Sequence, residues 1–148
     1  MRQALLALAV LALAVLALAG CGGGGGGRLS ASEYRSKADA ICADANAKLK
    51  NIGNPSTPAE LRSLLKKARP TLKNAIDKLE ALEPPKELEP KVDAWNSKND
   101  RLLDKYDALS KETNLVQLAA KAQELGKLND EANRYARTQL GLTDCASG

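Results

Sequence analysis

The chain has 148 residues, enough for one domain with its own core. It contains no histidine, which excludes a Ser-His-Asp or Cys-His catalytic arrangement, a histidine-containing zinc motif and the Glu-x-x-His di-iron site of helical bundles. A formal net charge of +4 is too small to indicate nucleic-acid binding, and abundant Ala, Leu and Lys without any Phe favour helices packed through aliphatic side chains.

The first 20 residues have the layout of a secretory signal peptide. A short positive head, Met1-Arg2-Gln3, precedes an unbroken run of Ala, Leu and Val from Ala4 to Ala19. An uncleaved membrane anchor is the alternative, but the run is shorter than the roughly 20 residues that a spanning helix needs. The four residues Leu18-Ala19-Gly20-Cys21 resemble the lipobox of bacterial lipoproteins. This resemblance implies cleavage before Cys21, a diacylglyceryl group on its thiol, and a mature chain anchored to the bilayer at the extracytoplasmic face of the cell membrane.

Six consecutive glycines, Gly22 to Gly27, follow the lipobox. Each glycine costs about 1 kcal/mol in a helix relative to alanine, so this run predicts a flexible tether. A phosphate-binding loop is not expected, because no strand precedes the run and no Gly-Lys-Ser or Gly-Lys-Thr follows it. We therefore divide the chain into a signal peptide at 1–20, a lipidated cysteine with its tether at 21–29, and a helical domain at 30–148.

Four amphipathic helices are predicted in that domain, because apolar residues recur there in steps of three and four. Each helix has a recognisable start: the capping box Ser30-Ala31-Ser32-Glu33, Thr57-Pro58, Glu89-Pro90, and Asn114 with Gln117. Gly53-Asn54-Pro55, Pro84-Pro85 and Gly141 are the corresponding stop signals for the first, second and fourth helices. The connections are short, so we expect an all-α, up-down-up-down antiparallel four-helix bundle.

Complementary charges lie beside the apolar faces of the second and third helices. The basic stripe comprises Arg62, Lys66, Arg69 and Lys73, and the acidic stripe comprises Asp100, Asp104 and Asp107. An antiparallel arrangement would put Lys73 level with Asp100, Arg69 with Asp104 and Lys66 with Asp107. We favour interhelical pairing that selects the neighbour. The alternative is a basic patch for anionic lipid headgroups or cell-wall polymers.

Two cysteines remain once Cys21 is assigned to lipid. Cys42 and Cys145 form an even pair in a chain with an export signal, so we expect them to form a disulfide. A metal or redox pair is the alternative, but there is neither a histidine nor a Cys-x-x-Cys spacing to support it. The disulfide would tie the C-terminal end to the first helix.

The remaining candidate site lies on the third helix, where Trp95, Asn99 and Tyr106 project to one side. They could line a small-ligand pocket, or they could be core residues with Asn99 fixing the helix register. Carboxylates are plentiful but fall on solvent or stripe positions, where acid–base catalysis is not expected. We predict a non-enzymatic binding or protein-interaction module of the cell envelope without cofactor, metal or nucleic acid, whose partner is another envelope protein or a small ligand. The alternative is a small-molecule or lipid-binding protein with a pocket near Trp95 and Tyr106.

Short motifs in the helical domain resemble a group of small actinobacterial lipoproteins. They are Tyr34 with Ala38-Asp39-Ala40-Ile41-Cys42, then Ala45-Asn46, and near the end Leu140-Gly141-Leu142 with Cys145. The resemblance implies a secreted helical domain in which an N-terminal and a C-terminal cysteine are paired. It implies no established activity.

Overall fold

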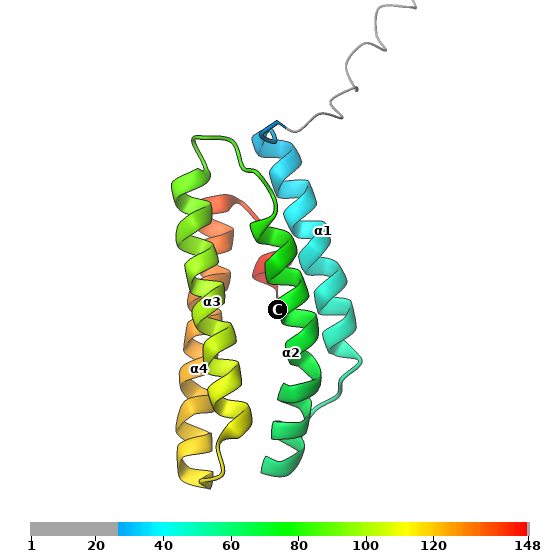
Figure 1. Cartoon of the computed structure of the whole chain (residues 1–148), viewed down its shortest axis with the longest axis vertical. Helices are drawn as coiled ribbons and strands as arrows, with labels where there is room; N and C mark the ends of the chain where they lie inside the picture. The colour runs from blue at the N-terminus through cyan, green and yellow to red at the C-terminus, as the bar shows by residue number, and fades with distance from the viewer. Residues whose placement is uncertain (1–26, 148) are drawn as a thin grey trace, which may run out of the picture.

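Four antiparallel helices form the described part of the chain, residues 27–147 of a computed structural model (Figure 1). Their bounds are α1 (Ala31–Lys50), α2 (Pro58–Glu80), α3 (Glu89–Lys111) and α4 (Leu115–Tyr135). The chain runs up and down through them in order, which confirms the predicted all-α bundle. The predicted signal peptide, the lipobox with Cys21 and most of the glycine tether lie outside the described residues.

The helix starts follow the local signals. The Ser30 hydroxyl accepts a hydrogen bond from the Glu33 N–H, and the Glu33 carboxylate accepts one from the Ser30 N–H, which completes the capping box. Thr57 caps α2, with Pro58 as its first residue, and the Asn114 side chain accepts from the N–H groups of the first turn of α4. These contacts satisfy N–H groups that lack partners within the helix.

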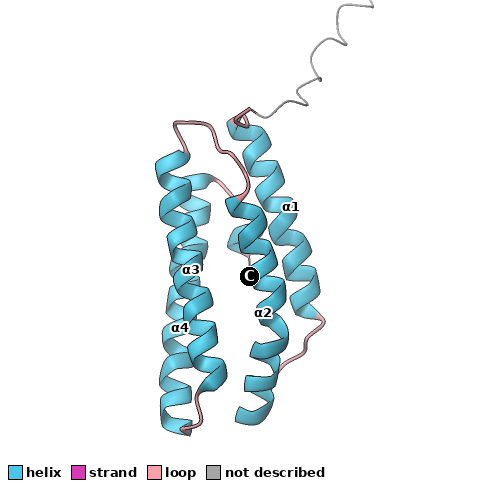
Figure 2. Ribbon diagram, viewed as in Figure 1, coloured by secondary structure: helices cyan, strands magenta, loops and turns pink. Residues whose placement is uncertain are grey.

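Neighbouring helices pack in chain order, α1 on α2, α2 on α3 and α3 on α4 (Figure 2). The fourth side differs, because α1 and α4 are bridged largely by a short helical turn at the C-terminus, η2 (Asp144–Ala146). Within residues 27–147, no helix combines the length and the apolarity needed to cross a bilayer.

The C-terminal tail, residues 141–147, returns to α1. Helix α4 continues into a π-helical turn, η1 (Ala136–Leu140), which ends at Gly141 with a φ of 71°, a left-handed conformation that glycine adopts without strain. The chain then reverses and η2 brings Cys145 to Cys42, with 5.0 Å between their Cα atoms, in the predicted disulfide. This reversal explains how a residue midway along α1 meets the end of the chain.

One face of α1 holds this tail. The Asp39 carboxylate accepts hydrogen bonds from the backbone N–H groups of Thr143, Asp144 and Cys145, at 2.9 to 3.3 Å. One turn before it, Arg35 Nε donates to the Leu140 carbonyl at 2.7 Å. Two turns beyond it, Asn46 Nδ2 donates to the Asp144 carbonyl at 3.0 Å. With Cys42, these side chains recur at helical spacing, so a single face of α1 binds the tail.

The core is divided into two clusters. The first lies at the disulfide end and includes Tyr34, Val92, Trp95 and Leu140. The second lies toward the α3–α4 turn and is built on Leu65, Leu109 and Leu118. Between the two clusters, side chains such as Leu72 and Leu102 are only partly buried. The middle of the bundle is therefore less completely filled than its ends.

The charged stripes of α2 and α3 meet, but not in the predicted register. Arg69 forms a bidentate pair with Asp107, one turn away from the predicted Asp104, and holds the pKa of Asp107 below its usual range. Lys73 binds Asp77 of its own helix. Asp100 lies beside Glu80, whose pKa is raised by burial and then by that neighbouring charge. The predicted register was therefore wrong, since it paired Lys73 with Asp100, Arg69 with Asp104 and Lys66 with Asp107.

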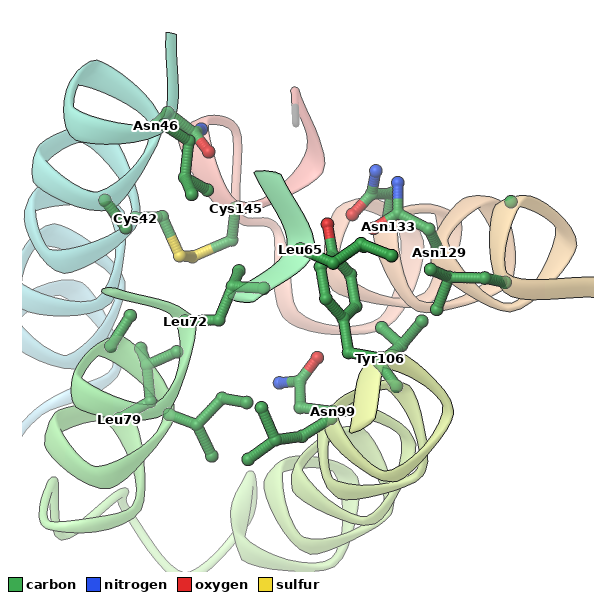
Figure 3. A pocket seen from close by; sticks show the side chains of 18 of the residues that line it. Cys42, Asn46, Leu65, Leu72, Leu79, Asn99, Tyr106, Asn129, Asn133 and Cys145 are labelled. Carbon is green, nitrogen blue, oxygen red and sulfur yellow. A yellow bond between two sulfur atoms is a disulfide. The ribbon is translucent and has the colours of Figure 1, made fainter. Parts of the chain in front are cut away.

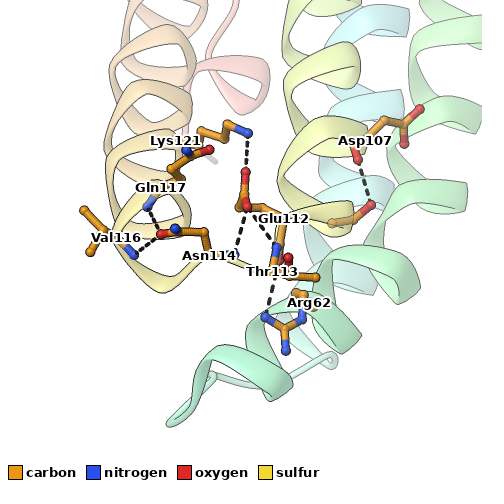
Figure 4. Close-up of polar contacts among 9 residues, drawn as sticks. Arg62, Asp107, Glu112, Thr113, Asn114, Val116, Gln117 and Lys121 are labelled. Atoms are coloured by element: carbon orange, nitrogen blue, oxygen red, sulfur yellow. Dashed lines mark hydrogen bonds and ion pairs between the residues drawn. The ribbon is translucent and has the colours of Figure 1, made fainter.

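Core packing explains the shift. Leu65 of α2 and Leu109 of α3 belong to the same buried cluster and fix the axial offset of the two helices. Burying one leucine contributes about 1.5–3 kcal/mol, whereas an exposed ion pair contributes about 0–1 kcal/mol. The leucines therefore decide the offset, and Arg69 takes the carboxylate within its reach. Further along, Arg62 donates to the Glu112 carbonyl at the α3–α4 turn, where the Glu112 carboxylate also accepts from Lys121 (Figure 4).

Candidate ligand-binding site

A cavity of about 460 Å³, partly open to solvent, lies between the two core clusters and is lined by all four helices and the C-terminal tail (Figure 3). It reaches from Leu79 and Trp95 of the first cluster to Leu65 and Leu109 of the second. Its size lies within the range of about 300–1,000 Å³ that small-molecule sites occupy. The gap in the core is thus large enough for a ligand.

The cavity exists because small residues on three helices do not fill it. Ala45 of α1, Ala75 of α2, and Ala122 and Gly126 of α4 line the cavity where longer side chains would fill it. A Cβ atom placed on Gly126 would meet no other atom within 4 Å. Most of the remaining wall is aliphatic: Leu49, Leu61, Leu65, Leu72, Ile76, Leu79, Leu102, Leu103, Leu109 and Leu125.

Asn99 is the polar group placed deepest in this wall. The residue is only 9% exposed, and its amide points toward the middle of the cavity (Figure 3). Within residues 27–147, the buried side-chain polar atoms without a hydrogen-bonding partner are Tyr34 Oη and Asn96 Oδ1, so the Asn99 amide is not sealed in the core but borders the open space of the cavity. An amide at the cavity surface can exchange hydrogen bonds with a bound molecule.

Other uncharged polar groups stand around Asn99. Tyr106 lies two turns beyond Asn99 on the same face of α3, and its hydroxyl points toward the side of the cavity where Asn129 and Asn133 of α4 lie (Figure 3). Burial raises the pKa of Tyr106 above its ordinary value, so the phenol is neutral and can donate a hydrogen bond at physiological pH. Asn46 lines the wall from α1.

No charged side chain lines the cavity. The Arg69–Asp107 pair and the other ion pairs of the described residues lie outside it. Within residues 27–147, no group of three or more His, Cys, Asp or Glu side chains is placed to hold a metal ion. The chemistry offered to a ligand is therefore dispersion contact with aliphatic groups and a few neutral hydrogen bonds.

The disulfide forms one end of this site. Cys42 and Cys145 both line the cavity, and the bridge between them lies beside Asn46 (Figure 3). The tail thus contributes a wall as well as a link between α1 and α4. A change that frees the tail would also open the cavity.

The structure brings together the three residues singled out on α3, since Trp95, Asn99 and Tyr106 all line the cavity. Cys21 lies outside the described residues. Sequence reasoning missed the α4 contribution of Gly126, Asn129 and Asn133. A signal was present, because these residues continue the spacing of Ala122 along one helix face, but two asparagines and a glycine do not resemble a buried stripe.

No family model, curated protein or solved structure matches this chain. The functional assignment therefore depends on the residues and geometry of the cavity.

Proposed function

We propose that this protein is a non-enzymatic, membrane-anchored lipoprotein whose helical domain binds a small, largely apolar ligand in the cavity between the two core clusters. The observation that carries the proposal is the cavity itself, about 460 Å³ in volume and bounded by aliphatic side chains with a few neutral polar groups. A mostly apolar wall with a small number of convergent polar groups is typical of small-molecule sites.

The environment of Asn99 supports a ligand site over a purely structural role. An asparagine that fixes helix register does so by pairing with a polar side chain across the interface. The Asn99 amide instead faces the cavity, and it is not among the buried polar atoms of residues 27–147 that lack a partner, Tyr34 Oη and Asn96 Oδ1. Its amide is thus available to a bound molecule.

A protein-interaction module is the second candidate. Leu115 and Val116, at the start of α4, are 61% and 80% exposed and lie at the end of the bundle opposite the beginning of α1 (Figure 1). Two side chains form a patch far smaller than the roughly 800 Å² that each partner buries in a stable interface. The cavity therefore supports the stronger proposal.

Binding can be tested with the single tryptophan, Trp95, which lines the cavity. Bromooctane should quench Trp95 fluorescence saturably in the full chain on phospholipid vesicles. Gly126→Phe should weaken this quenching at least about tenfold, because a ring at this position would occupy the cavity. Gly126→Ala is the matched control and should retain quenching.

The Gly126→Ala control makes a second measurement possible. It should raise the free energy of unfolding by about 1 kcal/mol, because alanine has the better helix propensity and its Cβ meets no neighbour. Equal quenching in the phenylalanine and alanine variants, or no saturable quenching in the unmodified chain, would contradict the proposed site.

Membrane anchoring through Cys21 is part of the same proposal and is supported by the lipobox pattern Leu18-Ala19-Gly20-Cys21. Two acyl chains give durable anchoring where a single chain would be marginal. Cys21→Ala should abolish acylation, so that the mass of a diacylglyceryl group is missing from the intact protein. If the natural chain stays in the membrane fraction although its intact mass includes no acyl group, anchoring through Cys21 is ruled out.

A further inference from the structure

The Asn99 amide defines which polar group a ligand should carry. Asn99 is only 9% exposed, and its amide points into the cavity, where a bound molecule can reach it (Figure 3). The amide both donates, through its NH₂ group, and accepts, through its carbonyl oxygen. A ligand group with the same dual capacity would satisfy both functions, and a hydroxyl or a carboxamide has it.

Tyr106 offers a second hydrogen bond of the same kind. It lies seven residues beyond Asn99, two turns along the same face of α3, and lines the same cavity. Its hydroxyl can donate or accept. These two groups place the hydrogen-bonding part of the site on α3, while α2 presents apolar side chains that include Leu72 and Ile76.

The absence of charge from the cavity wall restricts the ligand further. None of its lining residues, drawn from α1 to α4 and the tail, is Asp, Glu, Lys or Arg. A carboxylate or an ammonium group that binds against the apolar wall would lose part of its hydration without gaining a counter-ion, which is unfavourable. An uncharged head group avoids that penalty.

We propose that the cavity selects an uncharged amphipathic molecule, with an aliphatic body against α2 and a hydroxyl or carboxamide head group hydrogen-bonded to Asn99. This inference rests on the proposed function and adds the chemical class of the ligand. It excludes free fatty acids and alkyl amines as preferred ligands.

The test uses a matched series of probes that share one alkyl chain: octanol, octanamide, octanoate, octylamine and bromooctane. Each of the first four competes with bromooctane, and recovery of Trp95 fluorescence in the full chain on vesicles reports binding. Affinities are corrected for the partition of each probe into protein-free vesicles. Octanol and octanamide should bind at least about tenfold more tightly than octanoate and octylamine.

Asn99→Leu then tests the polar contact. It should weaken octanol and octanamide by about 2- to 10-fold, the value of one hydrogen bond, and leave direct quenching by bromooctane intact. Tyr106→Phe is a second variant that keeps the ring, and it should affect the same two probes more weakly. Both effects are measured relative to bromooctane, which separates head-group recognition from damage to the fold.

Three outcomes would count against the inference. Octanoate binding as tightly as octanol would overturn the uncharged head group and leave the proposed function standing. An Asn99→Leu variant that retains full affinity for octanol and octanamide would remove the assigned contact. If no probe binds, bromooctane included, the proposed function fails and the ligand class fails with it.

Discussion

Replacing Cys42 and Cys145 together with alanine is expected to lower the free energy of unfolding by about 4–5 kcal/mol. The bridge closes a loop with a sequence separation of 103 residues, and the chain-entropy model assigns this magnitude to a loop of that size. A domain typically has only about 5–15 kcal/mol of stability, so the loss is a large part of the total. Urea denaturation followed by circular dichroism measures it.

Reduction of the unmodified protein provides the control. A reductant should lower its stability by a similar amount and leave the double-alanine variant unchanged. Because the two cysteines line the cavity, quenching of Trp95 by bromooctane should also weaken in the variant. A stability loss below about 1 kcal/mol would show that the noncovalent contacts of the tail suffice to constrain it.

The helices were predictable because their start signals act within a few residues. Ser30, Thr57 and Asn114 each cap the helix that follows, and each bonds to N–H groups two or three positions along the chain. The pairing of Cys42 with Cys145 also followed from residue types alone, because few cysteines leave few combinations.

The axial offset of α2 and α3 was not predictable from the charges. Aligning opposite stripes assumes that ion pairs determine the offset, whereas buried leucines contribute more free energy and determine it instead. Arg69 consequently binds Asp107 and Lys73 binds Asp77. The charge pattern identified α3 as the neighbour of α2 but could not predict the axial offset between the two helices.

The cavity was only partly predictable for a related reason. The positions of Trp95, Asn99 and Tyr106 on one face of α3 follow from helical spacing. Whether that face meets a filled core or a gap depends on the size of the facing residues, and these include Ala75 and Gly126 from other helices. The spacing within α4 places Gly126 on the same face as Ala122, but its alignment with Ala75 of α2 is a tertiary property that no single helix reveals.

The tail contact made by Asp39 was also missed, and it leads to the second large effect. Asp39→Ala should lower the free energy of unfolding by about 2–3 kcal/mol, because three backbone N–H groups of residues 143–145 would lose a charged acceptor. The Thr143 hydroxyl would lose the same partner. Asp44→Ala is the matched control on the same helix, since Asp44 forms an exposed pair with Lys48 and its removal should change stability little.

The two tail constraints should be coupled. In the unmodified chain, the disulfide and the Asp39 carboxylate hold the same segment against α1. Each contact therefore positions the tail for the other. In the Cys42→Ala, Cys145→Ala background the tail can leave α1 without unfolding the remaining helices, and Asp39→Ala should then cost less than it does in the unmodified chain. A double-mutant cycle measured by urea denaturation gives this coupling. If the losses in unfolding free energy from Asp39→Ala and from the two cysteine substitutions simply add, Asp39 stabilises the η2 turn independently of the disulfide.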